Sequence, residues 1–240
     1  MLRRTAFRDM RMNVHSREPP VPDTVPQLHD DDAAKARRAR ILDAAERCFV
    51  RAGFHRTTMQ DVAAEAAMSP GNLYRYFASK GAIVAGLTER DRAEVGEDFA
   101  RLEDVEDLTE AFRGLAHHHF GTESREKTAL CLEIWAESAR NADFAAMSSA
   151  FECDITERLV ALFRRQQASG KIPREVAPEA LASLVCTYAD GMMVRRAILP
   201  GFDANTEIER FVAVIEAGMA GRIPLPPVPP TPAPPTPART

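Results

Sequence analysis

Two helix-start signals, at Thr58 and at Ser69, constrain the fold of this chain more than any other feature of its sequence. Thr58 is followed three residues later by Asp61, which is the spacing of a capping box. Ser69 is a favourable N-cap, and Pro70 suits the first helical position because its missing N–H would be unpaired there anyway. The spacing predicts two short helices joined by a tight turn. This is the helix-turn-helix arrangement, whose second helix can lie in a DNA major groove.

The helix that starts after Ser69 has one apolar face and one open face. On a helical wheel Leu73 and Phe77 fall together, so they are expected to face inward. Arg75 points away from them, with Gly71 and Asn72 beside it. Arginine and asparagine side chains match the hydrogen-bonding edges of bases, and a glycine lets the backbone approach the groove closely. The open face is therefore predicted to read DNA bases.

Residues around this face are predicted to hold the phosphate backbone. Tyr74 and Tyr76 flank the open face, where their hydroxyls can meet phosphates, and Lys80 lies in the first turn of the next helix. The helix starts at Thr58 and Ser69 add backbone N–H donors of the kind that bind phosphate.

Charge is divided unevenly along the chain. The net charge is −4 overall, yet residues 33–80 carry nine Lys or Arg against four acids, whereas residues 81–222 carry 25 acids against 16 bases. A basic module joined to a larger acidic one indicates that only the first meets an anion such as DNA. A DNA-architectural protein would instead need basic charge throughout.

The remainder of the folded chain is expected to be helical, because no alternating strand pattern is present. Starts at Asp, Asn, Ser or Thr and stops at Gly or Pro predict an all-α chain of nine helices. Their expected ranges are 33–52, 58–65, 69–76, 79–102, 107–120, 125–139, 142–168, 177–198 and 204–220.

The two ends of the chain are expected to be disordered. Residues 1–32 combine prolines with an acidic run and show no periodicity, and residues 222–240 form a proline-rich tail. The arginines of the arm could touch DNA, although a plain unstructured leader, or a start at Met10 or Met12, explains the arm more simply. No apolar run is long enough to span a membrane or to act as a signal peptide, so we expect no membrane partner and a cytoplasmic location.

Residues 35–95 resemble the N-terminal domain of TetR/AcrR-family transcriptional regulators, with the helix-turn-helix at 58–77. The matching features follow the family's order, and they are Ile41-Leu42-Asp43-Ala44-Ala45, Phe49, Gly53-Phe54, Thr57-Thr58-Met59, Asp61-Val62-Ala63, Ser69, Gly71-Asn72-Leu73-Tyr74, Tyr76-Phe77 and Ser79-Lys80. The resemblance implies DNA contacts at Thr58, Ser69, Pro70, Gly71, Tyr74, Arg75, Tyr76 and Lys80. The sequence departs from the family at Met68, Tyr76 and Gly81, so the family's half-site preference does not transfer.

The resemblance also implies that residues 96–221 form a helical domain for ligand binding and dimerisation. A weaker likeness at 131–163 supports this. It implies that the helices near 177–198 and 204–220 pack against their copies in a homodimer, although their apolar stripes would also suit core helices. The stripes are Leu181, Leu184, Val185, Tyr188 and Met192, and then Ile208, Phe211, Val212, Ile215 and Met219.

A pocket for an unknown small-molecule effector is expected among the middle helices of this domain. Aromatic and soft side chains that could line it are Phe112, His119, Trp135, Phe151, Tyr188 and Met192, each of which could equally be core. Glu133 and Asp190 are acids within apolar helices, and a cationic ligand, a solvated face or a core hydrogen bond would explain them.

We expect no cofactor and no metal. His117, His118 and His119 are consecutive, so on an α-helix they point about 100° apart and cannot jointly hold one ion. The four cysteines are far apart and are expected to be reduced core thiols. Catalytic motifs such as GxSxG and HExxH are absent, which leaves a helical enzyme with a histidine-lined site as a distant alternative.

The sequence therefore predicts a DNA-binding transcriptional regulator. The preferred form is a homodimeric repressor that a small molecule releases from a palindromic operator. A ligand-dependent activator or a co-repressor on the same fold fits the residues equally well, and repression rests on the family's usual behaviour.

Overall fold

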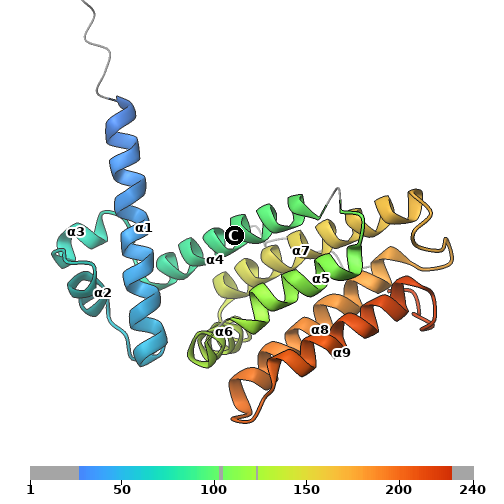
Figure 1. The fold of residues 1–240 in the computed structure, drawn as a ribbon. Helices are drawn as coiled ribbons and strands as arrows, with labels where there is room; N and C mark the ends of the chain where they lie inside the picture. Colours follow the sequence, from blue (N-terminus) through green and yellow to red (C-terminus); the bar gives the residue numbers. More distant parts are fainter. Residues whose placement is uncertain (1–26, 103–104, 123, 229–240) are drawn as a thin grey trace, which may run out of the picture. The chain divides into compact units, whose positions relative to one another are not determined.

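The structure is a computed structural model that describes residues 27–102, 105–122 and 124–228 (Figure 1). The chain divides into two units, residues 1–37 and residues 38–240. The described part of the first unit, residues 27–37, is helical. Most of the expected N-terminal arm and residues 229–240 of the proline-rich tail lie outside the described residues.

The described residues are helical with no strand, which confirms the all-α prediction. The α-helices are α1 (Gln27–Ala52), α2 (Met59–Glu65), α3 (Pro70–Tyr74), α4 (Lys80–Arg101), α5 (Leu108–Ala116), α6 (Arg125–Ser138), α7 (Ala142–Ala168), α8 (Pro178–Ile198) and α9 (Ala204–Met219). A π-helix, η1 (His117–Gly121), follows α5 directly. Residues 27–32, expected in the disordered arm, instead belong to α1, and the helix expected over 107–120 changes from α-helix to π-helix at His117.

Side-chain caps account for most of the helix starts. The hydroxyl of Ser79 accepts a hydrogen bond from the N–H of Ala82 at 3.1 Å, and the hydroxyl of Ser124 accepts one from Lys127 at 3.0 Å. Such caps satisfy N–H groups that have no partner within the helix. This is why boundaries derived from Ser, Thr and Asp in the sequence agree with the structure to within one or two residues at most of these ends.

Two hydrophobic clusters organise the fold. The first joins α1, α2, α3 and the start of α4, and its fully buried members include Ile41, Phe49, Val62, Leu73 and Ile83. Leu130 from α6 and Phe144 from α7 complete this cluster. The helix-turn-helix half, which comprises α1 to α3 and the start of α4, is therefore packed against the larger half, which comprises the helices that follow. The second cluster fills the space between α5, α7, α8 and α9.

The apolar stripes of α8 and α9 lie inside the protomer. Figure 1 shows α8 and α9 side by side, and their stripe residues belong to the second cluster, where Leu181 and Ile208 are fully buried. The core interpretation of these stripes is therefore confirmed, and a dimer would need other faces of the two helices. Among the described residues, no helix is both long enough and apolar enough to cross a membrane.

Candidate DNA-binding site and its links to the helical domain

The helix-turn-helix begins with the capping box that the sequence predicts. The Thr58 hydroxyl accepts a hydrogen bond from the N–H of Asp61 at 3.1 Å, and the Asp61 carboxylate accepts one from the N–H of Thr58 at 2.8 Å. The Thr58 hydroxyl also donates to the Asp61 carboxylate at 2.7 Å, and this hydrogen bond, together with the one from the Thr58 N–H, lowers the pKa of Asp61. At the next helix, the Ser69 hydroxyl accepts a hydrogen bond from the N–H of Asn72 at 3.3 Å, and Pro70 is the first helical residue.

The turn between α2 and α3 is a Schellman motif closed by an alanine. Ala67 has a φ of 53°, the left-handed region that glycine usually occupies at this position. Its N–H donates to the carbonyl of Ala64 at 3.0 Å, and the N–H of Met68 donates to the carbonyl of Ala63 at 2.9 Å. These two hydrogen bonds turn the chain sharply enough that only four residues separate the end of α2 from the start of α3.

The two faces of α3 are arranged as the helical wheel predicts. Leu73 is fully buried and Phe77 is 2% exposed, so the inward face is confirmed. Tyr74 is 53% exposed, and Arg75 is exposed at the C-cap of α3. Gly71 is also exposed, and a Cβ built there would meet open space. We name the surface formed by Tyr74, Arg75 and Gly71 the reading surface.

The other predicted DNA contacts differ in their exposure and in whether their side chains already make hydrogen bonds. Thr58, Ser69 and Pro70 are exposed, although the hydroxyls of Thr58 and Ser69 are already engaged in capping. Asn72 and Tyr76 are partly buried.

Lys80 occupies a different environment from the one expected of a phosphate ligand. Its ammonium donates hydrogen bonds to the backbone carbonyls of Phe54 at 2.7 Å and His55 at 3.2 Å. The same ammonium lies 4.6 Å from the centre of the Phe54 ring, within the range of a cation–π contact. Burial lowers the pKa of Lys80, although the nearby Glu133 carboxylate acts in the opposite direction. Its contacts therefore hold the loop after α1 against the start of α4.

The loop after α1 is also bound by a carboxylate of the larger half. Glu133 on α6 accepts a hydrogen bond from the N–H of Phe54 at 2.7 Å. Gly53 has a φ of 85°, and a Cβ there would lie 3.0 Å from the Glu133 carboxylate, so a glycine makes this close approach possible. The Phe54 ring packs edge-on against Phe49 and Phe144, with ring centres 5.6 Å away in each case. Glu133 thus makes a structural hydrogen bond, which is one of the three explanations that the sequence left open.

A second set of polar contacts joins α1, α4 and α6. Arg90 on α4 pairs with Glu46 on α1, and its guanidinium also lies 2.9 Å from Asp43. Lys127 on α6 lies 3.4 Å from Glu46. Burial acts to raise the pKa of Glu46, but Arg90 and Lys127 together leave it lower than usual. Sequence reasoning missed these residues, because no local pattern marks a charge whose partner lies on another helix.

The six residues proposed to line an effector pocket do not converge on one cavity. Phe112 and Met192 are buried in the second cluster, and Tyr188 packs against Phe211 with ring centres 5.2 Å apart. Trp135 is 37% exposed on α6, Phe151 is half-buried on α7, and His119 is bonded to Asp98. The structure therefore divides these six residues among core, surface and a polar cluster.

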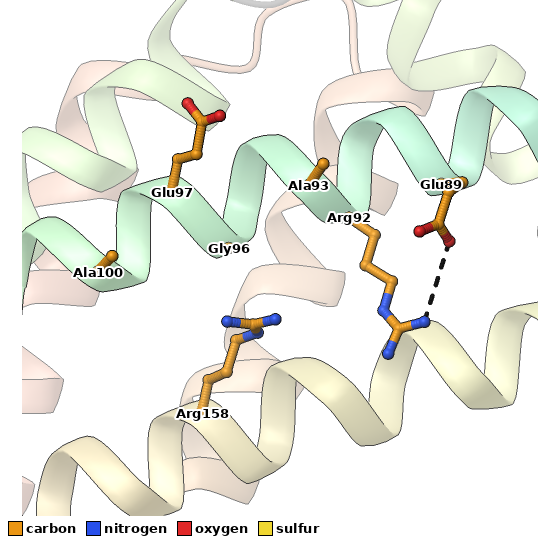
Figure 2. A pocket seen from close by; sticks show the side chains of 7 residues that line it. All are labelled: Glu89, Arg92, Ala93, Gly96, Glu97, Ala100 and Arg158. Carbon is orange, nitrogen blue, oxygen red and sulfur yellow. Dashed lines mark ion pairs between the residues drawn. The ribbon is translucent and has the colours of Figure 1, made fainter.

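A groove runs between α4 and α7 (Figure 2) and is lined by charged and small side chains. Arg158 extends from α7 toward α4, with its guanidinium close to Gly96, and Arg92 pairs with Glu89 at 3.9 Å. Arg92 and Arg158 both bond Asp154 and thereby lower its pKa. None of the six expected effector residues lines this groove.

Two family models match the chain. Residues 41–87 match the model described as bacterial regulatory proteins of the tetR family, and residues 119–221 match the C-terminal model of BetI-type transcriptional repressors. The first contains the whole helix-turn-helix, and the second covers the last three residues of η1 and the helices from α6 to α9.

Individual relatives agree with these models. The regulator UidR of Escherichia coli is 32% identical over 164 residues, which cover 67% of this chain and 81% of UidR. The structure of Salmonella enterica GusR is 29% identical, with a TM-score of 0.62 over 78% of this chain and 94% of GusR. A complex of SmeT with triclosan shares the fold at 22% identity, with a TM-score of 0.66 over 81% of this chain and 97% of SmeT.

An exposed reading surface, a capped helix-turn-helix and a packed helical domain accord with these matches. The relative and the family models whose descriptions state an activity are regulators of transcription. The comparisons therefore do not favour an enzyme. The chain belongs to the TetR family and is a DNA-binding transcriptional regulator.

Proposed function

We propose that this protein is a homodimeric repressor that leaves its operator when a small molecule binds the larger helical domain. The observation that carries the proposal is the reading surface, where Tyr74, Arg75 and Gly71 are exposed on a helix anchored by buried Leu73 and Phe77. The family description of residues 119–221 as a repressor's C-terminal part supports repression. The SmeT–triclosan complex shows that a protein of this fold binds triclosan.

We propose a division of labour among the DNA contacts. Arg75 reads a base edge, Asn72 assists it, and Gly71 allows close approach of the backbone. The phosphate backbone is held by Tyr74 and Tyr76 and by the residues at the starts of α2 and α3, which are Thr58, Ser69 and Pro70. Lys80 holds the loop after α1 and so positions the helix-turn-helix without contacting phosphate.

The dimer proposal rests on a different face of α8 from its buried stripe. Val194, Ile198 and Leu199 are large apolar side chains that are 37%, 58% and 38% exposed. Burying such a patch against a second copy removes apolar area from water. A dimer with two reading heads about 34 Å apart would match successive half-sites of a palindromic operator. Sedimentation of the wild type and of Ile198→Asp checks this, since a charge in the interface should favour monomers.

The effector is proposed to act through α4 and α6. Both helices hold the helix-turn-helix half, α6 through Glu133 and α4 through Arg90. A ligand that prefers another packing of the second cluster, near Phe112, Tyr188 and Met192, would shift these contacts and change the separation of the reading heads. Such a ligand must repack the cluster, because Phe112 and Met192 are each 2% exposed.

The test of DNA binding compares two exposed arginines. Arg75→Ala should weaken specific binding by about 1–3 kcal/mol and relax sequence preference at one base position. Arg174→Ala, an exposed arginine in the larger domain, is the control and should bind like the wild type. Footprinting and titration on the DNA upstream of the protein's own gene measure both. Wild-type binding by Arg75→Ala would contradict the proposed reading surface.

A separate experiment tests effector response. Trp135 is partly exposed on α6, so Trp135→Ala should fold normally. We expect this variant to bind the operator unchanged but to respond differently to small molecules that release the wild type. An identical response of the two proteins would remove Trp135 from the proposed effector contacts.

A further inference from the structure

The run of three histidines is organised by η1 and by the last turns of α4. His117, His118 and His119 lie in a π-helix, so the α-helical spacing assumed from the sequence does not apply to them. Asp98 on α4 supplies a ligand-type side chain from a second helix. Sequence reasoning considered only the histidines and therefore missed a cluster that spans two helices.

The cluster brings nitrogen and oxygen atoms to one point. His119 Nε2 lies 2.8 Å from Asp98 Oδ2, and the rings of His118 and His119 have centres 4.9 Å apart. One ligand-type atom from each of Asp98, His118 and His119 can be chosen so that all three lie within 4.8 Å of one another. Glu94, one helical turn before Asp98, adds a carboxylate oxygen 3.3 Å from His118 Nε2.

The Asp98 carboxylate is held in place at the centre of the cluster. Its side chain is 6% exposed, and a buried carboxylate needs charged or hydrogen-bonding partners to offset the loss of water. Arg101 bonds one oxygen, Oδ1, at 2.6 Å, which leaves Oδ2 directed at His119. In metal sites, a hydrogen bond to the carboxylate oxygen that does not bind the metal orients the carboxylate, and Arg101 makes such a bond to Oδ1.

We propose that Asp98, His118 and His119, with Glu94 as the fourth residue, bind a divalent first-row transition metal such as Zn²⁺. Donor atoms around a tetrahedral zinc lie ~3.3 Å apart when the bonds are about 2.0 Å long, so small side-chain movements from the present distances suffice. Two imidazoles and two carboxylates suit zinc, nickel or cobalt, whereas Mg²⁺ prefers oxygen ligands alone. Binding requires the Nε2 proton of His119 to move to Nδ1 or to leave, so protons compete with the metal.

The experiment uses the full chain without an affinity tag, because a histidine tag would itself bind metal. Calorimetric titration with Zn²⁺, and the visible absorption of added Co²⁺, should both show one ion per chain. His118→Ala and His119→Ala should each weaken Zn²⁺ binding about tenfold or more. His117→Ala is the matched control, because His117 lies on the same π-helix but faces Glu209 at 3.9 Å.

Three outcomes would overturn the proposal. One is a wild-type chain that binds neither Zn²⁺ nor Co²⁺, in which case His119 and Asp98 form only a hydrogen bond. Another is unchanged Zn²⁺ binding by His118→Ala, which would place the metal elsewhere, for example on cysteines. The third is an equal loss in His117→Ala. His118 is 55% exposed, so its replacement should leave the thermal unfolding of the metal-free protein unchanged, and a loss of binding cannot be attributed to misfolding.

Discussion

The carboxylate of Glu133 and the backbone N–H of Phe54 are joined by a hydrogen bond of 2.7 Å across 79 positions of the sequence. The carbonyl of the same Phe54 residue accepts a hydrogen bond from Lys80. Both backbone groups of Phe54 are thus bound by side chains, one from α6 and one from α4. A movement of either helix acts directly on the loop that connects α1 to the helix-turn-helix.

Glu133→Ala should lower the free energy of unfolding by about 1–3 kcal/mol, because it leaves the N–H of the buried Phe54 without a protein partner. Denaturant titration measures the loss. Glu137→Ala is the control, since Glu137 lies one turn further along α6 and reaches the same loop only through an exposed His55 at 3.8 Å. It should change stability by less than about 0.5 kcal/mol, as exposed pairs do. Equal losses of stability in the two variants would show that the hydrogen bond to Phe54 stabilises the fold no more than an exposed ion pair does.

Lys80→Ala should destabilise the fold by about 1–2 kcal/mol through lost hydrogen bonds and the lost contact with the Phe54 ring. The sequence places Lys80 at the phosphate backbone, which would instead reduce the salt dependence of DNA binding by about one unit. From its contacts in the structure we expect the slope of log affinity against log salt to stay unchanged. Measuring both quantities on one variant separates the two roles, and a slope reduced by one would return Lys80 to the phosphate contacts.

Helix boundaries and the inward face of α3 could be predicted because their causes are local. A Ser hydroxyl caps the helix that follows it, and Leu73 and Phe77 share a face through helical geometry alone. The contacts of Lys80 and Glu133 could not be predicted. Each is a charge on a helix, and its sequence neighbours do not reveal that the partner is a backbone group of a distant loop.

The π-helix and the turn after α2 show a related limit. The sequence around the histidine run predicts an α-helix. Only the structure shows that these residues form a π-helix and that His119 contacts Asp98. Ala67 carries no sign of a left-handed conformation, since alanine favours helices. In both places the tertiary arrangement determines the backbone against the local preference.

Ala67→Gly should raise the stability of the fold. A left-handed conformation costs an alanine about 1–2 kcal/mol, and glycine avoids most of that cost while losing more chain entropy on folding. The expected net gain is about 0.5 kcal/mol, visible as a higher midpoint of thermal unfolding. Ala64→Gly, at a helical residue in the last turn of α2, is the control and should lower the midpoint. A decrease for Ala67→Gly would mean that the turn carries no strain at this residue.

Asp91 should make the stability of the protein depend on pH. Partial burial raises its pKa to about 6, opposed by Lys127 and Arg90 and reinforced by Glu46 and Glu94. The folded state therefore holds the proton more tightly than the unfolded chain, whose ordinary value is 3.8. Stability is lost as the pH rises from the lower value to the upper one, and the loss is complete above the upper value.

Asp91→Asn removes the ionisation and should stabilise the protein more at about pH 7.5 than at about pH 4.5. The Asp91 side chain is 47% exposed, so solvent screening limits the difference to roughly 0.5–1 kcal/mol. Urea titrations at the two pH values measure it. Glu89→Gln, at a side chain that is 75% exposed on the same helix, should show the same small effect at both. Equal shifts at the two pH values would mean that the Asp91 carboxyl has the same pKa in the folded and unfolded chains. Burial would then not raise the pKa of Asp91.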